Sequence, residues 1–317
     1  MSSQLTRIEK EDERLFNTPQ KWFVRQKWLD YSITRKVRNN RNFIRLLTLT
    51  CTRVYEIKLL RDNQLFLHQD SGAFDPRCLS FCEMNDHRFV LIQRVLPGAK
   101  YFKGRFEDLV GAGRAGYGVS RVDVWFPFDI INLDINDCIL KRNSKIFEAI
   151  RKLFIIQKMK SQSFTLFLTI CSVQEGDHKE NIQALRRDFD RNLDDQDVER
   201  TFLEKYPNSI FEAYHDFQSV TIPKRIVEYG LSEGFDTKCN EKFTYIGEGL
   251  STRMVSLIFE CEYLGQNYLA HLAGIRKTRI LEILENDCRD INQMMEQDEE
   301  LLQAMTRLKS RYSEHVP

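Results

Sequence analysis

Segments that read as strands alternate with segments that read as helices over the first half of the sequence. Four strand candidates are short, apolar and rich in β-branched or aromatic residues, and they lie at 43–50, 78–85, 126–135 and 164–173. Helical patterns of roughly ten to fifteen residues separate them, at 52–62, 86–96 and 144–160. This alternation is typical of a doubly wound α/β fold with a mostly parallel sheet.

Three further segments extend this pattern. The stretch 99–109, AKYFKGRFEDL, predicts another strand that runs into a turn. A helix is expected over 222–235, closed by Gly230 or Gly234. The segments 236–249 and 253–265 then predict two adjacent strands, which we expect to pair antiparallel at the end of the sheet.

These segments predict three parts of the chain. Residues 1–40 form an N-terminal basic helical segment, with a polar lead-in over 1–17 and a helix that has Thr18 as N-cap and Pro19 at its first position. Residues 41–265 form the α/β domain, with a charged helical insert at about 175–220. Residues 266–317 form a C-terminal helical extension.

Charge is unevenly distributed, although the chain as a whole carries a net charge of +1. From Lys21 to Arg45 there are eight Lys or Arg and one acid, whereas from Glu282 to Glu300 there are eight acids and one base. One interpretation is two solvated helix faces that neighbour each other in the fold. The other is a basic surface for nucleic acid or an acidic partner, made by Arg35, Lys36, Arg38 and Arg41.

The C-terminal extension has an apolar row with alternating spacings of three and four residues. Neither Gly nor Pro interrupts the sequence between Ile275 and Val316, and Asp298 is the one polar member of the row. Such a row predicts a long helix that packs on its own domain or on the N-terminal helix, or one that self-associates or contacts a protein partner. Its members are Leu281, Leu284, Cys288, Ile291, Met295, Asp298, Leu302 and Met305.

Several features indicate a soluble cytoplasmic protein. The longest apolar runs, such as 164–170, are too short to span a bilayer, and the N-terminus lacks the apolar core of a signal peptide. The eight cysteines are scattered without a C-x-x-C pair, which favours free thiols in a reducing compartment. The six histidines are dispersed, and we expect no metal site.

Gly111, Gly113 and Gly116 spell G-x-G-x-x-G, the fingerprint of a dinucleotide-binding loop. That loop needs an apolar strand before it and a helix directly after it. Here the preceding residues, FKGRFEDL, end in an acidic turn, and no helix can start for ten residues afterwards. We interpret the match as a chance pattern in a loop.

Polar residues at the carboxyl ends of the predicted strands are the better candidates for a site, because ligands of a doubly wound sheet bind there. Glu83 ends the second strand, and an acid in that position can hold ribose hydroxyls. The others are Thr50, Cys51 and Thr52 after the first strand, Glu107 and Asp108 after the third, and Asn132 and Asp134 at the end of the fourth.

Taken together, these stretches over about residues 40–265 resemble a class I S-adenosylmethionine-dependent methyltransferase, a Rossmann-like fold that ends in an antiparallel strand pair. FPFDIINLDI also resembles bacterial methyltransferase-like proteins of unassigned function. The resemblance implies S-adenosylmethionine as cofactor, with its ribose at Glu83 and its adenine near Glu107 or Asp108. It places the methionine moiety at the loop of Thr50, Cys51 and Thr52. Asn132 and Asp134 would face that moiety or the methyl acceptor, as catalytic residues.

The first loop departs from the family pattern. Family members carry two or three glycines there, whereas LTLTCTRVYE has none, and Arg53 would repel a sulfonium cation. The fourth strand also lacks the proline and aromatic of [D/N]-P-P-[Y/F]. We therefore expect a methyltransferase-fold protein with impaired or lost catalysis, a binding subunit in a bacterial multi-protein system of phage-defence type. The alternative is an active methyltransferase acting on nucleic acid or a small molecule.

Overall fold

The computed structural model describes residues 2–67, 72–111, 125–135, 139, 144–172, 183, 187, 195–207, 214–248, 250–265 and 272–313. The chain divides into two compact units. The first consists of Met1–Asp134, Tyr245–Thr252 and Asp290–Pro317, and the second of Ile135–Thr244 and Arg253–Arg289. The chain returns from the second unit to the first over Tyr245–Thr252, and it returns again within the two-residue strand β8 (Arg289–Asp290).

Four strands of the first unit lie in the order β3-β2-β1-β4, and all neighbours are parallel. Their bounds are Leu46–Thr48 for β1, Leu79–Glu83 for β2, Lys100–Lys103 for β3 and Ile130–Asp134 for β4. Leu47 of β1 lies opposite Ser80 on one side and Ile131 on the other. The chain order reverses beside β1, so the carboxyl end of β1 is the switch point where this class of sheet binds ligands.

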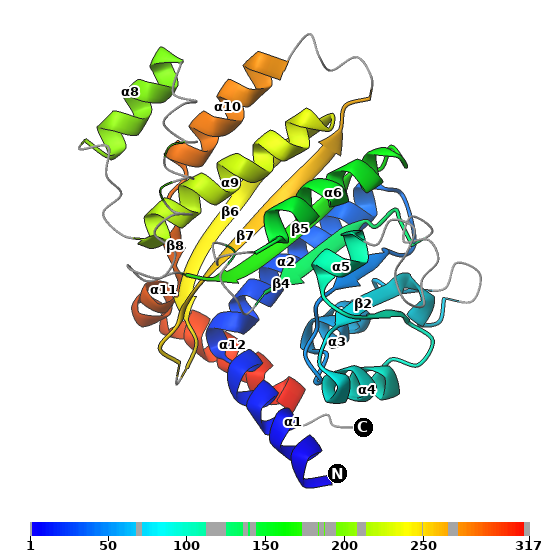
Figure 1. Ribbon diagram of the computed structural model, residues 1–317. Helices are drawn as coiled ribbons and strands as arrows, with labels where there is room; N and C mark the ends of the chain where they lie inside the picture. The colour runs from blue at the N-terminus through cyan, green and yellow to red at the C-terminus, as the bar shows by residue number, and fades with distance from the viewer. Residues whose placement is uncertain are drawn as a thin grey trace. The chain divides into compact units, whose positions relative to one another are not determined.

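Helices α2 (Pro19–Arg38) and α12 (Glu299–Ser313) pack against each other in the first unit (Figure 1). As predicted, Thr18 caps α2 by accepting a hydrogen bond from the Lys21 backbone N–H at 3.3 Å, and Pro19 is its first residue. The Trp22 and Tyr312 rings stack with their centroids 4.8 Å apart. The other helical segments of this unit are α1 (Ser2–Phe16), α3 (Tyr55–Asp62), η1 (Pro76–Cys78), α4 (Asp86–Val95), α5 (Phe106–Gly111) and α11 (Ile291–Gln297).

In the second unit the strand order is β5-β7-β6, and β5 runs antiparallel to β7. Helix α9 packs on β7 and contacts α6 and α10 (Figure 1). Phe154, Phe164 and Phe235, from α6, β5 and β6, form an aromatic cluster with centroids 5.3–5.5 Å apart. The elements are α6 (Ile146–Lys158), β5 (Phe164–Cys171), α8 (Gln196–Lys205), α9 (Tyr214–Ser232), β6 (Phe235–Ile246), β7 (Arg253–Tyr263) and α10 (Leu272–Glu285).

These strands confirm the predicted fold class. The first unit has parallel strands whose chain order reverses beside β1, and β7 runs antiparallel to β5. This is the arrangement expected of a methyltransferase-like α/β fold. The N-terminal helix and the C-terminal helices are present as well. Gly113 and Gly116 of the G-x-G-x-x-G pattern, and much of the charged insert, lie outside the described residues.

Several predicted element boundaries were wrong. The strand expected over 99–109 ends at Lys103. The residues that follow form helix α5, whose buried face consists of Phe106, Leu109 and Val110. The helix expected over 222–235 begins at Tyr214 and includes Pro223. The C-terminal row is not one helix, because α10, α11 and α12 are separated at residues 286–290 and at Asp298.

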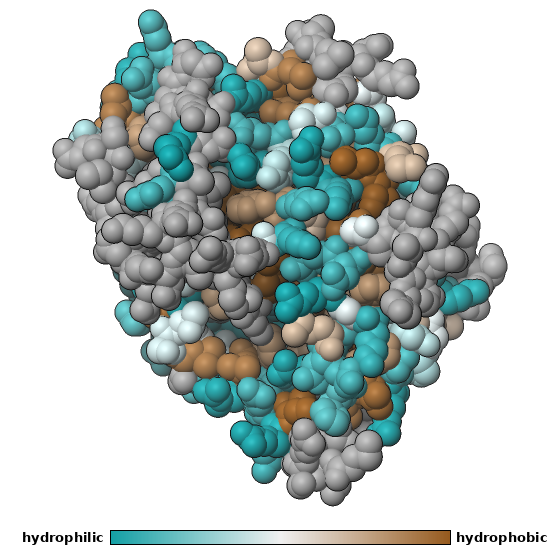
Figure 2. All heavy atoms as spheres, in the orientation of Figure 1, coloured by the Kyte–Doolittle hydropathy of each residue, from teal (hydrophilic) through white to brown (hydrophobic). Residues whose placement is uncertain are grey.

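Apolar side chains that remain exposed are spread over several elements, such as Val37 on α2, Met84 after β2 and Met159 after α6. On the face drawn in Figure 2, hydrophobic residues form separate patches between hydrophilic ones. Scattered patches of this kind are normal for a protein surface and do not mark a docking site. Among the described residues, none of the helices has the length and apolar character needed to cross a membrane.

Replacing Tyr312 tests the contact between α12 and the rest of the first unit. The Tyr312 hydroxyl donates to Asp62 at 2.9 Å, and its ring is buried against Trp22. Tyr312→Phe should lower the free energy of unfolding by about 1 kcal/mol, and Tyr312→Ala by about 3–5 kcal/mol. Urea unfolding measures both, with the exposed Gln303→Ala as the control that should change little. Equal losses for Phe and Ala would contradict ring packing.

Candidate functional site

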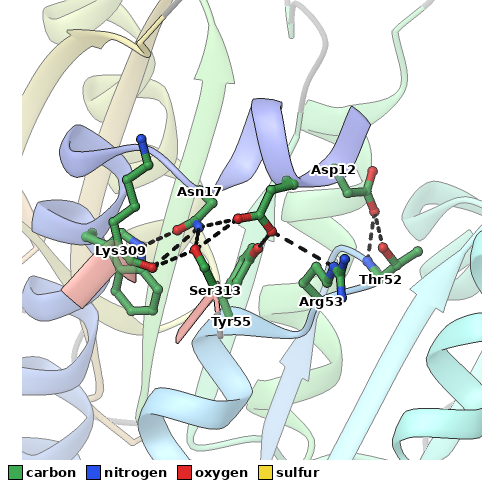
Figure 3. Close-up of polar contacts among 9 residues, drawn as sticks. Asp12, Asn17, Thr52, Arg53, Tyr55, Lys309 and Ser313 are labelled. Atoms are coloured by element: carbon green, nitrogen blue, oxygen red, sulfur yellow. Dashed lines mark hydrogen bonds and ion pairs between the residues drawn. The ribbon is translucent and has the colours of Figure 1, made fainter. Parts of the chain in front are cut away.

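The turn between β1 and α3 is covered by helix α1. Thr50, Cys51 and Thr52, the predicted cofactor loop, are all buried, at 7%, 6% and 4% exposure. The Asp12 carboxylate of α1 accepts hydrogen bonds from the Thr52 backbone N–H at 2.9 Å and from its hydroxyl at 2.7 Å (Figure 3). The Asp12 carboxylate therefore accepts the hydrogen bonds of the Thr52 donors beside the switch point.

Asp12 has a third donor on the neighbouring helix. Arg88 of α4 donates from Nη2 to the other Asp12 oxygen at 2.7 Å, and it also lies 3.8 Å from Glu11. Asp12 itself is 0% exposed. A buried carboxylate is tolerated only when it is paired and hydrogen-bonded, and Asp12 meets both conditions.

The turn contains one left-handed residue, and it is not glycine. Val54 adopts φ +48° and ψ +40° at the N-cap of α3, where its side chain is 1% exposed. An L-residue in this conformation costs roughly 1–2 kcal/mol. The helix expected to begin at residue 52 begins at Tyr55 for this reason, since residues 51–54 form the turn. The turn thus keeps a glycine-like conformation without the open space that glycine would leave.

Glu13, the next residue of α1, joins the turn to the C-terminal helix. Its carboxylate accepts hydrogen bonds from the Tyr55 hydroxyl, from Asn17 Nδ2 at 2.6 Å and from Ser313 Oγ at 3.0 Å, and Arg53 lies 3.9 Å away. Partial burial disfavours the charged form, but the hydrogen bonds from Tyr55, Asn17 and Ser313 outweigh it. The pKa of Glu13 therefore lies below its ordinary value.

Asp134, predicted to be catalytic, forms a buried ion pair at the end of β4. The Lys21 ammonium of α2 lies 2.6 Å from its carboxylate and 3.2 Å from the Tyr245 hydroxyl, and the Lys21 and Asp134 side chains are 3% and 8% exposed. Burial alone would lower the pKa of Lys21, but the charge of Asp134 outweighs it and raises that pKa above its ordinary value. The ammonium is therefore held in its charged form beside Asp134.

A second buried cation lies beside Lys21 on α2. The Arg25 guanidinium lies over both the Trp22 and the Tyr55 ring, 4.9 and 5.0 Å from their centroids, and it donates to the Phe16 carbonyl at 2.8 Å. Burial raises the pKa of the nearby Glu56 carboxyl, and the charge of Arg25 opposes that rise. The carboxyl ends of β1 and β4 therefore face a packed group of charged residues.

Asn132, the other predicted catalytic residue, has a buried side chain that contacts the neighbouring strand β1. Its Nδ2 donates to Thr48 Oγ1 on β1 at 3.3 Å, and the residue is 2% exposed. Within the described part of the chain, its buried Oδ1 has no hydrogen-bond partner. The structure thus brings Asn132 close to the switch point without exposing it.

Glu83 ends β2 as predicted, and the charges of Asp12 and Arg88 act on it. One oxygen accepts a hydrogen bond from the Asn85 backbone N–H at 2.6 Å. Burial raises the pKa of Glu83, opposed by that hydrogen bond and by the charge of Arg88. Glu107 and Asp108 lie in the first turn of α5 rather than after a long strand, and Asp108 is exposed.

The predicted nucleic-acid surface is wrong at one position. Arg35 is 1% exposed, so its guanidinium is not on the surface. Lys36 donates to the Gln64 carbonyl at 2.9 Å, and Arg41 lies 3.5 Å from the buried Asp129. Arg38 is exposed. A row of basic residues at the end of a helix looked accessible in sequence, but the helix turns one of its members into the core.

The residues that define the site were missed by sequence reasoning. Asp12 and Glu13 lie in a stretch interpreted as a polar lead-in, and it forms helix α1 instead. Lys21 and Arg25 were counted only as part of a basic segment, and Arg88 only as part of a helix. The acidic run EKEDER before Thr18 is the one signal in the sequence. It could have suggested a charged helix that forms ion pairs with basic residues elsewhere in the chain.

Breaking the Lys21–Asp134 pair from one side should be costly. Asp134→Asn leaves the ammonium buried without its counter-charge, so we expect the free energy of unfolding to fall by about 3–5 kcal/mol. The double variant Lys21→Met with Asp134→Leu removes both charges and should recover much of that loss, as measured by urea unfolding. A loss below about 1 kcal/mol for Asp134→Asn would contradict a structural role for the pair.

Glu13 should make the stability depend on pH. Its pKa is lower in the folded chain, so its contribution is present above the unfolded pKa and is lost as the pH falls through the folded value. The urea midpoint of the wild type should therefore drop more steeply between about pH 5 and pH 3 than that of Glu13→Gln. Glu9→Gln, one turn earlier on α1, is the matched control. Parallel profiles for wild type and Glu13→Gln would refute the assignment.

Comparison with known proteins gives one family and a distant set of structures. A family model described as PP_RS20740-like matches residues 83–316. None of the curated proteins matches the sequence.

Three solved structures resemble the chain at low identity. The plantazolicin methyltransferase BamL, in complex with a triazolic desmethylPZN analog and SAH, is 9% identical over 82% of this chain and 90% of that chain, with a TM-score of 0.38. EvdMO1 is 9% identical over 74% of this chain and 40% of that chain, with a TM-score of 0.33. Human Methyltransferase-like protein 13 in complex with SAH is 10% identical over 77% of this chain and 83% of that chain, with a TM-score of 0.30. Likenesses this distant carry no argument about a ligand or a reaction.

Proposed function

We propose that this chain, which belongs to the PP_RS20740-like family, is a methyltransferase-fold protein that has lost methyl transfer and serves as a binding subunit. The observation that carries the proposal is the occupied turn after β1. Asp12 takes both the backbone N–H and the hydroxyl of Thr52 and excludes solvent from them. A ligand bound at the carboxyl end of β1 would need the space in front of this turn.

The charges at the strand ends support the same proposal. S-adenosylmethionine carries a sulfonium cation, and in an active enzyme the end of β4 would face its methionine moiety or the acceptor. In this chain the Lys21 ammonium occupies that end, 2.6 Å from Asp134. A second cation placed beside a buried ammonium is strongly unfavourable, because like charges repel more in a low-dielectric interior than in water.

The alternative, an active S-adenosylmethionine-dependent methyltransferase, requires α1 to leave the turn. Asp12, Glu13 and Asn17 would then lose their contacts with Thr52, Arg88, Tyr55 and Ser313 together. A ligand can move α1 only if its affinity for the open turn exceeds the free energy of these contacts.

Calorimetric titration of the full chain with S-adenosylmethionine, and separately with S-adenosylhomocysteine, tests the proposal. We expect neither heat of binding nor a rise in melting temperature at millimolar ligand, because the turn is filled. Saturable binding of either compound with one site per chain would overturn the loss of cofactor binding. In that case Glu83→Ala would show whether the ribose position is the one that the methyltransferase resemblance implies.

A further inference from the structure

Three hydrogen-bond donors from two separate elements converge on one carboxylate. Thr52 supplies its backbone N–H and its hydroxyl to one Asp12 oxygen, at 2.9 and 2.7 Å, and Arg88 supplies its guanidinium to the other, at 2.7 Å. Charged hydrogen bonds of this length are stronger than neutral ones. Donors that reach both oxygens of a carboxylate form an anion-binding site, whichever molecule carries the anion.

The burial pattern of α1 shows that Asp12 is held as a ligand rather than as part of an apolar face. Among residues 7–16, whose side chains the structure describes, Asp12 is the only buried residue, whereas Ile8 and Leu15 remain partly exposed. A helix that docks by hydrophobic burial presents its apolar residues to the core. This part of α1 presents a carboxylate instead.

Thr52 and Arg88 belong to the sheet-and-helix body of the first unit, and they would need another anion if the Asp12 carboxylate were removed while α1 stayed in place. With α1 packed over the turn, Thr52 is 4% exposed, so its donors would lie buried without an acceptor, which costs free energy. The surroundings contain both signs of charge: Arg53 belongs to the turn, and the charge of Glu83 acts on the same region. Glu11, the other acid near Arg88, lies 3.8 Å from its guanidinium.

We propose that the turn after β1 is a carboxylate-binding site, that Asp12 occupies it from within the chain, and that a carboxylate-bearing small molecule can take Asp12's place. The tethered Asp12 competes at an effective concentration of the order of millimolar or higher, so the wild type masks the site. S-adenosylmethionine and S-adenosylhomocysteine also carry a carboxylate, so the site is tested with acetate, which has no adenosine. Failure of acetate would overturn the carboxylate site and leave the loss of methyl transfer standing.

Chemical rescue of full-length Asp12→Ala by sodium acetate tests the site. The variant lacks the internal carboxylate, and acetate can accept the bonds from Thr52 and Arg88. We expect acetate to raise the melting temperature of Asp12→Ala by about 2 °C or more at saturation, and that of the wild type much less. Sodium chloride at equal ionic strength should give no such rise.

Second-site variants show whether the rescue occurs at this site. Adding Arg88→Gln or Thr52→Val to Asp12→Ala should abolish the acetate-dependent rise, whereas Glu9→Ala, which removes a carboxylate one turn away, should behave like the wild type. Absence of any acetate effect on Asp12→Ala would overturn the proposal. Rescue that survives both second-site changes would place acetate elsewhere and would also overturn it.

Two further outcomes are decisive. If inorganic phosphate stabilises Asp12→Ala and acetate does not, the site is not a carboxylate site and the proposal fails. If Asp12→Ala folds only when acetate is present, exchange into chloride should abolish its circular dichroism signal, which supports the proposal. A variant that is equally unfolded in acetate and in chloride refutes it.

Discussion

The donors of a buried turn have to meet acceptors, and this requirement organises the N-terminal part of the molecule. With α1 packed over the turn, Thr52 lies at 4% exposure, four residues after the end of β1, so water does not satisfy its N–H and hydroxyl. Asp12 supplies the acceptor, and Arg88 balances the charge. The same helix carries Glu13, which accepts hydrogen bonds from Tyr55 and Ser313.

The carboxyl edge of the sheet in the first unit is consequently packed with paired charges. Lys21 with Asp134, and Arg25 with the rings of Trp22 and Tyr55, fill positions that a ligand-binding sheet normally leaves open. Each such group is costly to bury and remains only because its partners are in place. Under the proposed function, these buried charges lie at the edge where a sheet of this class binds its ligand.

Local sequence was enough for the start of α2 and for the strand ends at which the site lies. Thr18 and Pro19 mark the start of α2 because capping depends on neighbours within three residues. Glu83 and Asp134 were correctly placed at strand ends because period and length distinguish strands from helices. Phe106, Leu109 and Val110 could also have been recognised, since their spacing is helical.

Partners that are distant in the chain could not be predicted in this way. Asp12 and Thr52 are 40 residues apart, and nothing near Asp12 distinguishes it from a solvated acid. Arg35 looks like its basic neighbours until the packing of α2 determines which side faces inward. Val54 shows the same limit for the backbone, because its left-handed conformation depends on the surrounding turn.

The link between Glu13 and Ser313 has a consequence for the order in which the molecule is completed during translation. The two residues are 300 positions apart, and Asn17 also bonds to Ser313. At about 5–20 residues per second, the ribosome makes Ser313 about 15–60 seconds after Glu13. Over that interval α1 can contact only the N-terminal part of the chain, including Thr52, Arg88 and Arg25, and the contacts of Glu13 are completed only when α12 arrives.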